Sequence, residues 1–327
     1  MDYKSLPLGE GAELCEADEG AVCRNSIDIW GELVRYFPHQ SKIKDFCQLP
    51  PGEAFGCSRT GTIFHRQLVK KMYTKEDYIA VFDSGVGGIS VLRQLRKLMP
   101  DEKYVYFGDS ANAPYGTRPT QQVRDLTLAA AEKLMSEYPV KALVVACNTA
   151  TAAGIDNLRE KYPDLIVIGI EPALKLAADR HPGGTIGVMA TQVTLREEKF
   201  DQLMHRFDST CRVEKIPAPG LVELIESGRG DSEEAMEFLH NLLDDYVGKL
   251  DALVLGCTHY PFVKRNIAAI LGPQVEILHG GRGTARETRR RLEKRNLLAE
   301  GEGSVEIINS AGNQKLMDLC WKLLNQP

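Results

Sequence analysis

From residue 78 onward, short apolar segments typical of β-strands alternate with amphipathic helical segments, and this alternation limits the fold more than any other feature. The helical segments carry apolar residues at intervals of three and four, as in Gln122–Ser136 and Glu233–Val247. The expected strands are Tyr78–Phe82, Tyr104–Phe107, Ala142–Ala146, Leu165–Ile170, Thr185–Met189, Arg212–Ile216, Ala252–Leu255, Val275–Leu278 and Val305–Ile308. Strands separated by helices favour mostly parallel sheets that are covered by helices on both faces. We therefore predict an α/β fold.

Two pairs of segments in this region resemble each other. KALVVACNT (Lys141–Thr149) matches DALVLGCTH (Asp251–His259), with Ala-Leu-Val and the cysteine aligned. YIAVFDSGVGG (Tyr78–Gly88) is loosely matched by TIGVMATQVT (Thr185–Thr194). This self-similarity predicts two similar lobes, each a mostly parallel sheet flanked by helices, related by a pseudo-two-fold axis. Because open α/β sheets bind ligands beyond the carboxyl ends of their strands, both cysteine-bearing turns should face an active site between the lobes.

Residues 1–77 differ from the rest of the chain. They contain scattered prolines and glycines, and their cysteines lack the C-x2-C spacing of zinc sites, so a metal site is the weaker alternative there. We predict an irregular N-terminal extension that is poorly packed or disordered. Met72 stands just before the first expected strand, and we hypothesise that the functional protein starts at this residue.

Charge and hydropathy exclude several classes of protein. The 40 basic and 45 acidic residues give a net charge of -5, whereas non-specific nucleic-acid binding usually needs a basic face. No apolar run is long enough to span a membrane, and the N-terminus lacks the basic start and apolar core of a secretory signal. These features predict a cytoplasmic protein with no nucleic-acid or membrane partner, in which the eight cysteines are free thiols, ligands or nucleophiles.

Polar turns follow the first two expected strands. DSGVGG (Asp83–Gly88) exposes backbone N–H groups at the start of a helix, an arrangement that receives anionic groups such as carboxylates. It lacks the G-x-G-x-x-G spacing of dinucleotide-binding turns, and on this motif alone a plain turn with Asp83 or Ser84 as helix cap is the favoured interpretation. GDSANAPYG (Gly108–Gly116) either lines the cleft or forms a surface loop.

Cys147 and Cys257 each end an expected buried strand and are followed by hydroxyl and amide side chains. One buried cysteine is usually a small core residue. Two in equivalent positions of two lobes indicate a pair of reactive thiols, and a nearby helix N-terminus can lower a thiol pKa and favour the thiolate. His259 follows Cys257 by two residues and either assists it or is a structural histidine.

A facing pair of thiols suits a reaction that inverts a stereocentre without a cofactor. One group removes a proton from one face of the α-carbon, and the other delivers a proton to the opposite face. Thiols with an ordinary pKa near ~8.5 can act as base or acid near neutral pH, so the two can exchange roles with the enantiomer. A disulfide reductase would also use two cysteines, but these usually stand close together as C-x-x-C. The wide separation of Cys147 and Cys257 favours a proton-transfer pair on separate lobes.

Five motifs together resemble those of glutamate racemases, within the aspartate/glutamate racemase superfamily. In chain order from residue 78 onward they are DSGVGG, GDSANAPYG, ACNTA, PAPGLVELIESG and GCTHYP. The resemblance implies proton transfer between L- and D-glutamate with no cofactor, neither pyridoxal phosphate nor a metal. It also implies a supply of D-glutamate for peptidoglycan synthesis, and a homodimer.

The resemblance further implies roles for individual residues. Cys147 and Cys257 are the implied proton donors and acceptors. Asp83 is expected to assist Cys147, and Glu226 with His259 to assist Cys257. The implied contacts with the substrate are made by Asp83, Ser84, Tyr115, Gly116, Asn148, Thr149, Thr258 and His259.

The family's fold implies that the C-terminal segment returns to the first lobe. Domain one would then comprise residues 78–172 and 270–327, and domain two residues 173–269. One stretch, LHGGRGTARE, departs from the family, because His279 stands where members commonly have Asp and Arg282 adds positive charge. We expect this departure to alter a loop, the contact between lobes or regulation, and to leave activity intact.

Two other functions stay open on the sequence. One is racemisation of aspartate or another amino acid of the same superfamily, because the motifs do not define the size of the pocket. The other is a non-catalytic regulatory or binding protein, for example one that restrains DNA gyrase, as some glutamate racemases are implicated in doing. The intact cysteine pair weighs against a purely non-catalytic protein.

Overall fold

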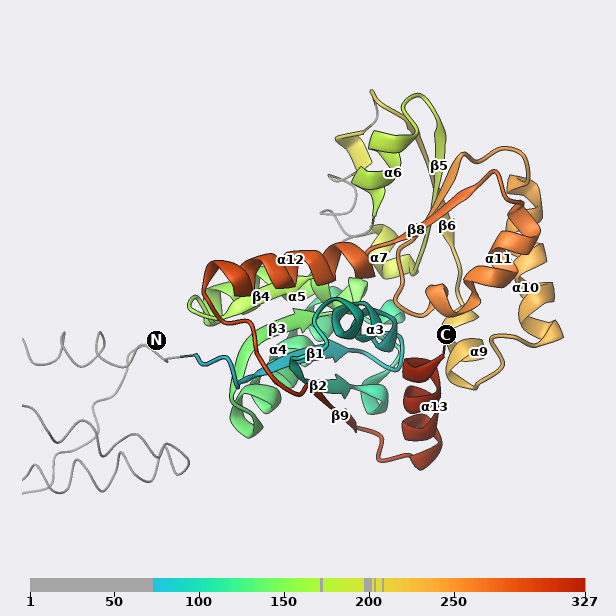
Figure 1. Ribbon diagram of the computed structural model, residues 1–327. Coiled ribbons are helices and arrows are strands. Elements are labelled where there is room, and N and C mark those ends of the chain that lie inside the picture. Colours follow the sequence, from blue (N-terminus) through green and yellow to red (C-terminus); the bar gives the residue numbers. More distant parts are fainter. Residues whose placement is uncertain (1–72, 171–172, 197–201, 203, 208, 327) are drawn as a thin grey trace, which may run out of the picture. The chain divides into compact units, whose positions relative to one another are not determined.

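The strands form two parallel sheets, as the alternation of segments predicts (Figure 1). The computed structural model describes residues 73–326 except 171–172, 197–201, 203 and 208. All these residues belong to one unit of the chain. The predicted N-terminal extension, apart from residues 73–77, and the proposed start at Met72 lie outside the described residues.

The first sheet has the strand order β4-β3-β1-β2-β9. Its strands are β1 (Tyr78–Asp83), β2 (Lys103–Gly108), β3 (Val140–Val145), β4 (Ile166–Gly169) and β9 (Ser304–Asn309). The helices that cover it are α3 (Ile89–Leu98), α4 (Thr120–Glu137), α5 (Asn148–Lys161), α12 (Gly281–Lys294) and α13 (Gln314–Asn325). Together these elements make the first lobe.

The second sheet has the strand order β6-β5-β7-β8. Its strands are β5 (Thr185–Ala190), β6 (Arg212–Pro217), β7 (Ala252–Leu255) and β8 (Glu276–His279). The helices of this second lobe are α6 (Leu174–Arg180), α7 (Gln192–Arg196), α9 (Leu221–Glu226), α10 (Glu233–Leu243) and α11 (Lys264–Leu271). None of the helices in the described part of the chain has the length and hydropathy needed for a membrane span.

The two sheets share one topology, which confirms the prediction of similar lobes. β1 lies between β2 and β3, with β4 outside β3; β5 lies between β6 and β7, with β8 outside β7. The two cysteine-bearing strands, β3 and β7, are therefore equivalent neighbours of the central strands. The first lobe differs by an additional strand, β9, which pairs with β2.

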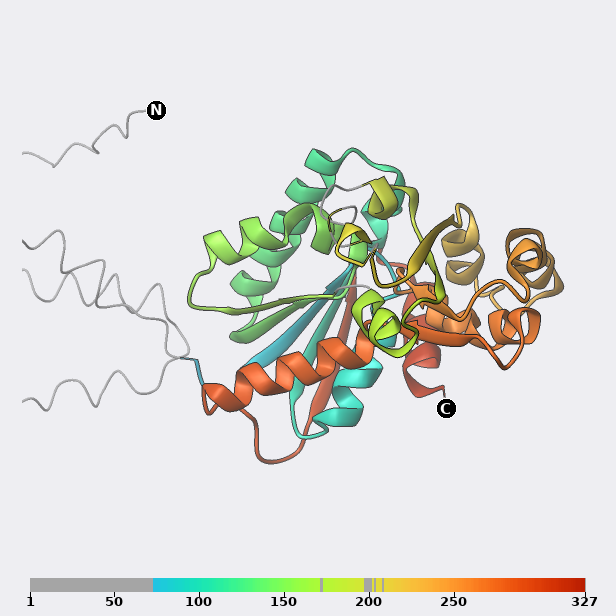
Figure 2. The same ribbon diagram turned by 90° about the horizontal axis from the view of Figure 1, so that it is seen from above.

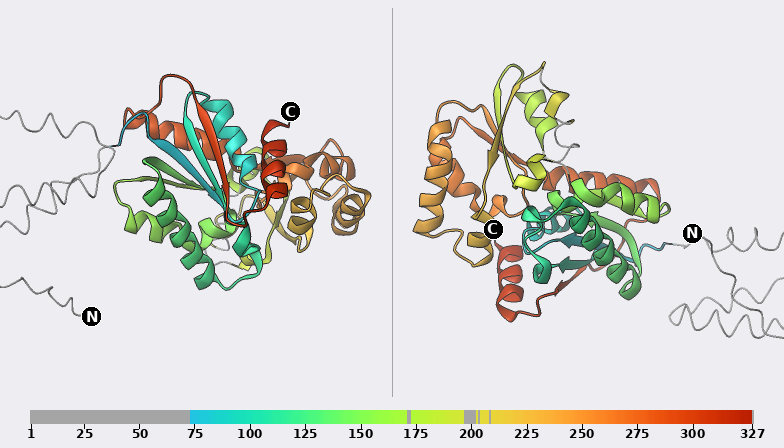
Figure 3. Two further views of the ribbon diagram at one scale, coloured as in Figure 1. Left: turned by 90° about the horizontal axis from the view of Figure 1, so that it is seen from below. Right: turned by 180° about the vertical axis from the view of Figure 1, so that it is seen from behind.

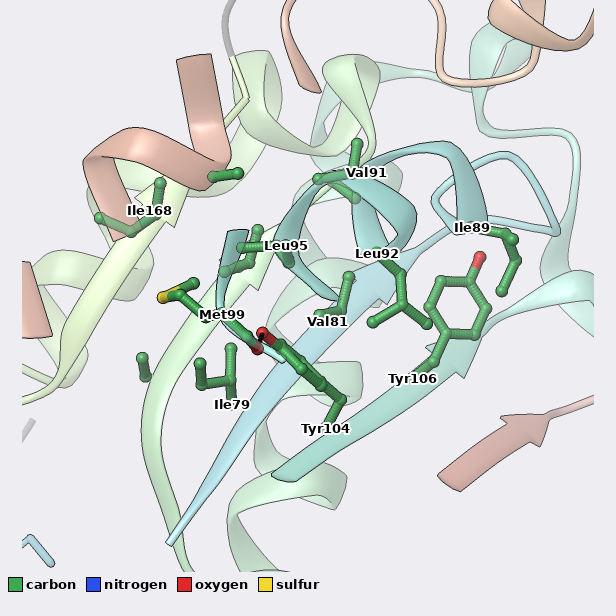
Figure 4. Packing of buried hydrophobic residues seen from close by; sticks show 14 of the residues in the cluster. Ile79, Val81, Ile89, Val91, Leu92, Leu95, Met99, Tyr104, Tyr106 and Ile168 are labelled. Atoms are coloured by element: carbon green, nitrogen blue, oxygen red, sulfur yellow. Dashed lines mark hydrogen bonds between the residues drawn. The ribbon is translucent and has the colours of Figure 1, made fainter. Parts of the chain in front are cut away.

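Alternate side chains of the first sheet pack into two separate cores. On one face, Ile79 and Val81 of β1 pack under Leu92 and Leu95 of α3, as Figure 4 shows. On the opposite face, Phe82 and its neighbours pack against helices α4 and α5. Because both faces of the strands are buried, they read as continuous apolar runs in the sequence.

The C-terminal part of the chain returns to the first lobe, and Figures 2 and 3 show α12, β9 and α13 beside the elements built from residues 78–169. The boundary predicted near residue 270 is too early, however. β8 pairs with β7 through Leu253↔Ile277 and Leu255↔His279, so it belongs to the second sheet. We propose that the return to domain one begins after His279. An apolar strand does not reveal from its own sequence which sheet it joins.

A buried ion pair lies at the start of β3, at the end of the strand away from Cys147. Lys141 is fully buried, and its ammonium lies 2.6 Å from a carboxylate oxygen of Glu102, which is also buried. The same ammonium donates to the carbonyl of Leu297, in the connection between α12 and β9. These contacts connect the start of β3 with the residue before β2 and with the segment between α12 and β9.

Candidate active site

A cavity of about 150 Å³ lies between the two lobes. Three segments of the first lobe line it, after β1 (Ser84), after β2 (residues 113–117) and after β3 (residues 147–149). Three segments of the second lobe complete it, after β5 (residues 191–192), after β6 (residues 218–226) and after β7 (residues 256–259). The carboxyl ends of equivalent strands therefore meet at one cavity, as expected for facing α/β sheets.

Cys147 lies at the N-cap position of α5 and lines the cavity. Its sulfur accepts a hydrogen bond from the Ala150 N–H at 3.4 Å and lies 3.4 Å from the Ser84 hydroxyl. Burial, followed by the negative charge of Asp83, raises the pKa of the Cys147 thiol to about 12, although the contacts with Ser84 and Ala150 act to lower it. The expected lowering of the pKa by the helix N-terminus is therefore wrong for this thiol, because burial outweighs the helix.

Cys257 lines the cavity from the opposite lobe and has a different neighbour. Its sulfur lies 3.6 Å from Nδ1 of His259, and Nε2 of the same ring lies 2.9 Å from a carboxylate oxygen of Glu226. Burial acts to lower the pKa of His259, but its hydrogen bonds to Cys257 and Glu226 outweigh burial and raise the pKa well above its usual value. Glu226, His259 and Cys257 thus form a continuous chain of contacts, and assistance to Cys257 by the other two stays a prediction.

Asp83 is fully buried and does not line the cavity, whereas the adjacent Ser84 does. Its carboxylate accepts hydrogen bonds from the Gly85 N–H and from the Thr258 hydroxyl, both at 3.0 Å. Burial dominates the electrostatics of this group and raises the pKa of Asp83. Both carboxylate oxygens of Asp83 thus contact protein groups, and its contact with the substrate stays a prediction.

The DSGVGG turn does receive a carboxylate, but the carboxylate belongs to the protein. The Val86 N–H donates to Glu226 at 3.1 Å, across the two lobes. The lack of a side chain at Gly87 allows the two lobes to come this close, because a Cβ at this position would lie 2.5 Å from Nδ1 of His259. These glycines bring the backbone of the first lobe against the polar groups around Cys257.

The remaining predicted contact residues line the walls of the cavity. Asn148 is buried and lines the cavity, and among the described atoms its Oδ1 has no hydrogen-bond partner. The Tyr115 hydroxyl donates to Asp109 at 2.8 Å, so it is the Tyr115 ring that lines the cavity, together with Gly116. Thr258 joins them from the second lobe. The structure therefore brings together all the predicted site residues, with Asp83 standing behind the cavity surface.

Several lining residues were missed by the sequence reasoning. Thr191 lies 3.2 Å from the Thr149 hydroxyl and follows β5 as Ser84 follows β1. The loose match of Tyr78–Gly88 with Thr185–Thr194 contained this signal, since it aligns the two turns. Gln192, Pro219, Val222 and Glu223 also line the cavity. The last three lie within the motif PAPGLVELIESG, but the sequence analysis assigned none of the four a role.

The departure at His279 and Arg282 lies away from the cysteine cavity. Both residues line a different hollow, of about 580 Å³, beside α6 and α12. Burial, then the charges of Lys264 and Arg93, lowers the pKa of His279 to about 4, so its ring is neutral near neutral pH. Within the described residues, no cluster of three or more His, Cys, Asp or Glu side chains could hold a metal ion.

Comparison with known proteins agrees with this geometry. The Asp/Glu/Hydantoin racemase family model matches residues 89–288. A glutamate racemase of Clostridium acetobutylicum is 49% identical over 257 residues, which cover 78% of this chain and 100% of that protein. Among solved structures, a glutamate racemase isoform of Bacillus anthracis has a TM-score of 0.71 at 30% identity, covering 77% of this chain and 95% of that one. The glutamate racemase of Escherichia coli has a TM-score of 0.70 at 30% identity, covering 76% and 95%. The chain therefore belongs to the Asp/Glu/Hydantoin racemase family and is an amino-acid racemase of the glutamate racemase type.

Proposed function

We propose that this racemase interconverts L- and D-glutamate by transferring a proton between substrate and two thiols, Cys147 and Cys257. One observation carries the proposal: the two cysteines line a single cavity from equivalent positions in opposite lobes. A planar, carbanion-like α-carbon between them would have one sulfur on each face. This is the arrangement that inversion of the stereocentre requires.

The reaction needs one thiolate and one thiol in each direction. The thiolate takes the α-proton from one face, and the opposite thiol gives its proton to the other face. The product is the mirror-image amino acid, and the two sulfurs have exchanged protonation states. His259 donates from Nδ1 to the sulfur of Cys257 when that sulfur is the base, and Glu226 holds the ring in place from Nε2. On the other side, Ser84 and the Ala150 N–H stabilise negative charge on Cys147.

Polar groups around the cavity supply complementary contacts for an amino acid. The side-chain amide of Asn148, which lines the cavity, carries both a hydrogen-bond acceptor and donors for an amino acid. The Thr149 hydroxyl and the first N–H groups of α5 can donate to carboxylates. The Escherichia coli relative is a complex with L-glutamate, which favours glutamate over aspartate as the substrate of this chain.

Deuterium incorporation tests the proposed reaction most directly. In D2O, each enantiomer of glutamate should acquire deuterium at the α-carbon as it converts to the other, without added pyridoxal phosphate and in the presence of a chelator. A parallel incubation with L- and D-aspartate tests the alternative that aspartate is the substrate. If none of these acidic amino acids exchanges its α-proton, the proposed function is wrong.

We also propose that the product supplies D-glutamate for peptidoglycan, in keeping with the bacterial relatives. A bacterial strain that requires D-glutamate should grow without it when this chain is expressed. The matched control is the Cys147→Ala variant, which should fail to support growth. Growth with this variant would mean that the chain acts in some other way.

A further inference from the structure

We propose that Ser90 is a positioning residue for the Cys257 half of the reaction, acting through the backbone of Thr258. The proposal rests on the two-thiol function given above. Ser90 does not line the cavity, and its influence on the chemistry would pass through one hydrogen bond between the lobes.

The contact joins the first turn of α3 to the turn that carries Cys257. The Ser90 hydroxyl donates to the carbonyl of Thr258 at 2.8 Å, and both residues are buried. Thr258 directly follows Cys257, and its own hydroxyl donates to Asp83. The residue next to the thiol is therefore held twice by the first lobe, once through its side chain and once through its backbone.

The donor stands on a rigid support. Ile89 and Leu92 on either side of Ser90 are fully buried in the core beneath α3, and Figure 4 shows both of them packed over β1 and β2. A buried carbonyl that loses its donor carries a desolvation cost, so the surrounding backbone tends to shift until another donor or water satisfies it. In this turn such a shift would move Cys257, because the two residues share a peptide bond.

Ser90 should affect the two thiols unequally. Cys147 is fixed within the first lobe at the start of α5, where Ala150 and Ser84 contact its sulfur. The hydrogen bond from Ser90 goes to the other cysteine turn. Loss of the Ser90 hydroxyl is therefore expected to impair proton transfer at Cys257 and to spare proton transfer at Cys147.

Racemisation alone cannot reveal this difference, because enantiomers have equal free energy and kcat/KM must fall equally in both directions. A glutamate analogue with chlorine on C3 separates the two sides. Removal of its α-proton by one thiolate expels chloride, and the enamine that forms tautomerises and hydrolyses to a 2-oxo acid and ammonium. Only one cysteine acts on each α-enantiomer. The Cys147→Ser and Cys257→Ser variants identify which enantiomer depends on which thiol.

The decisive measurement is kcat/KM for elimination from both analogues by the Ser90→Ala variant. We expect a loss of between about tenfold and a hundredfold for the Cys257-dependent enantiomer, in line with a small misplacement of a reacting group, and less than about threefold for the other. Ser90→Thr, which keeps a hydroxyl, should recover most of the loss. Thr288→Val is the matched control, because it removes a buried hydroxyl that donates to Thr284 in α12, and both eliminations should stay near wild type.

Equal losses with both enantiomers would overturn the proposal and indicate a general structural effect. Unchanged rates for both enantiomers would also overturn it. Failure of the two-thiol function itself would look different, because the wild-type protein would then show no α-proton exchange and the cysteine variants would not divide the enantiomers between them.

Discussion

The two lobes share a strand order, but they surround their cysteines with different chemistry. Cys147 faces a hydroxyl and a helix N-terminus, with the buried Asp83 nearby, and its thiol pKa is raised to about 12. Cys257 faces a histidine whose own pKa is raised by its contacts with Cys257 and Glu226. The comparison teaches that the shared strand order places the two cysteines opposite each other, whereas their protonation states depend on side chains that the lobes do not share. The sites need only similar proton affinity when substrate is bound, and two different environments can achieve it.

Removing either thiol should have the largest effect. We expect Cys147→Ala and Cys257→Ala each to lower racemisation by at least about a thousandfold, since each deletes one of the two groups that move the proton. A coupled assay or circular dichroism of the amino acid measures the rate. Cys320→Ala is the control and should leave the rate near wild type, because Cys320 is on the buried side of α13 in the core of the first lobe. Substantial racemisation by either active-site variant would refute the pairing.

The opposite ends of the cysteine strands also differ, and this difference concerns stability. Lys141 of β3 is buried against Glu102, while the equivalent Asp251 before β7 is exposed and accepts from the Thr185 N–H. Lys141→Met should destabilise the protein by about 3–5 kcal/mol, because it leaves a buried carboxylate unpaired. Asp251→Asn keeps an acceptor and should cost less than ~1 kcal/mol. Urea denaturation measures the free energy of unfolding of both variants. Equal denaturation midpoints would contradict the predicted difference between the two strand ends.

The close approach at Gly87 tests how tightly the first lobe must meet the polar groups of the second. Gly87→Ala should destabilise the protein by about 1–3 kcal/mol and lower activity, because the new methyl group would overlap His259 and Thr258. Gly283→Ala is the matched control. Gly283 lies in α12 with open space around its Cβ position, so alanine there should be neutral or stabilising by up to ~1 kcal/mol. Similar thermal midpoints for the two variants would show that the contact tolerates extra volume.

The smallest expected effect concerns the pH dependence of the Cys257 side. His259 has a raised pKa in the folded protein. The stability that its protonated ring contributes is therefore fully present below the pKa of the unfolded state, and it is lost as pH rises through the pKa of the folded state. Glu226→Gln removes one cause of that increase while keeping an acceptor for the Val86 N–H. The alkaline limb of kcat/KM should therefore move to lower pH, with a drop of roughly tenfold near neutral pH, equivalent to ~1.5 kcal/mol for a hydrogen bond to a charged group.

Glu276→Gln provides the control for this profile. Glu276 pairs with His181 and Arg180 on the second lobe and does not line the cysteine cavity. Its substitution should leave the pH profile of racemisation unchanged. An alkaline limb that stays in place in the Glu226 variant would mean that it reports a group other than His259.

The fold and the two thiols could be predicted because local patterns determine them. Strands buried on both faces are continuous apolar runs, and the polar residues that follow Cys147 and Cys257 mark where each strand has ended. The matching segments around Cys147 and Cys257 then predict equivalent positions in two lobes. These features need no knowledge of which residues approach each other across the molecule.

The features that were not predicted depend on contacts between distant segments. The sequence does not show that both oxygens of Asp83 are occupied, because one donor, Thr258, comes from the other lobe. Burial of Cys147 reverses the pKa shift expected from its helix, and burial is a property of the assembled cavity. The role of Ser90 likewise becomes visible only when its partner carbonyl is known.

The return of the chain to the first lobe after β8 has a mechanical consequence. The backbone passes between the lobes twice, once between β4 and α6 and again at His279, where β8 leads into α12. With a single crossing, only noncovalent contacts would limit the direction in which the second lobe moves. Two crossings favour a rotation about the line that joins them. Substrate must enter and leave a small cavity lined by both lobes. We therefore expect substitutions at His279, which lies at the second crossing, to change how readily the lobes open.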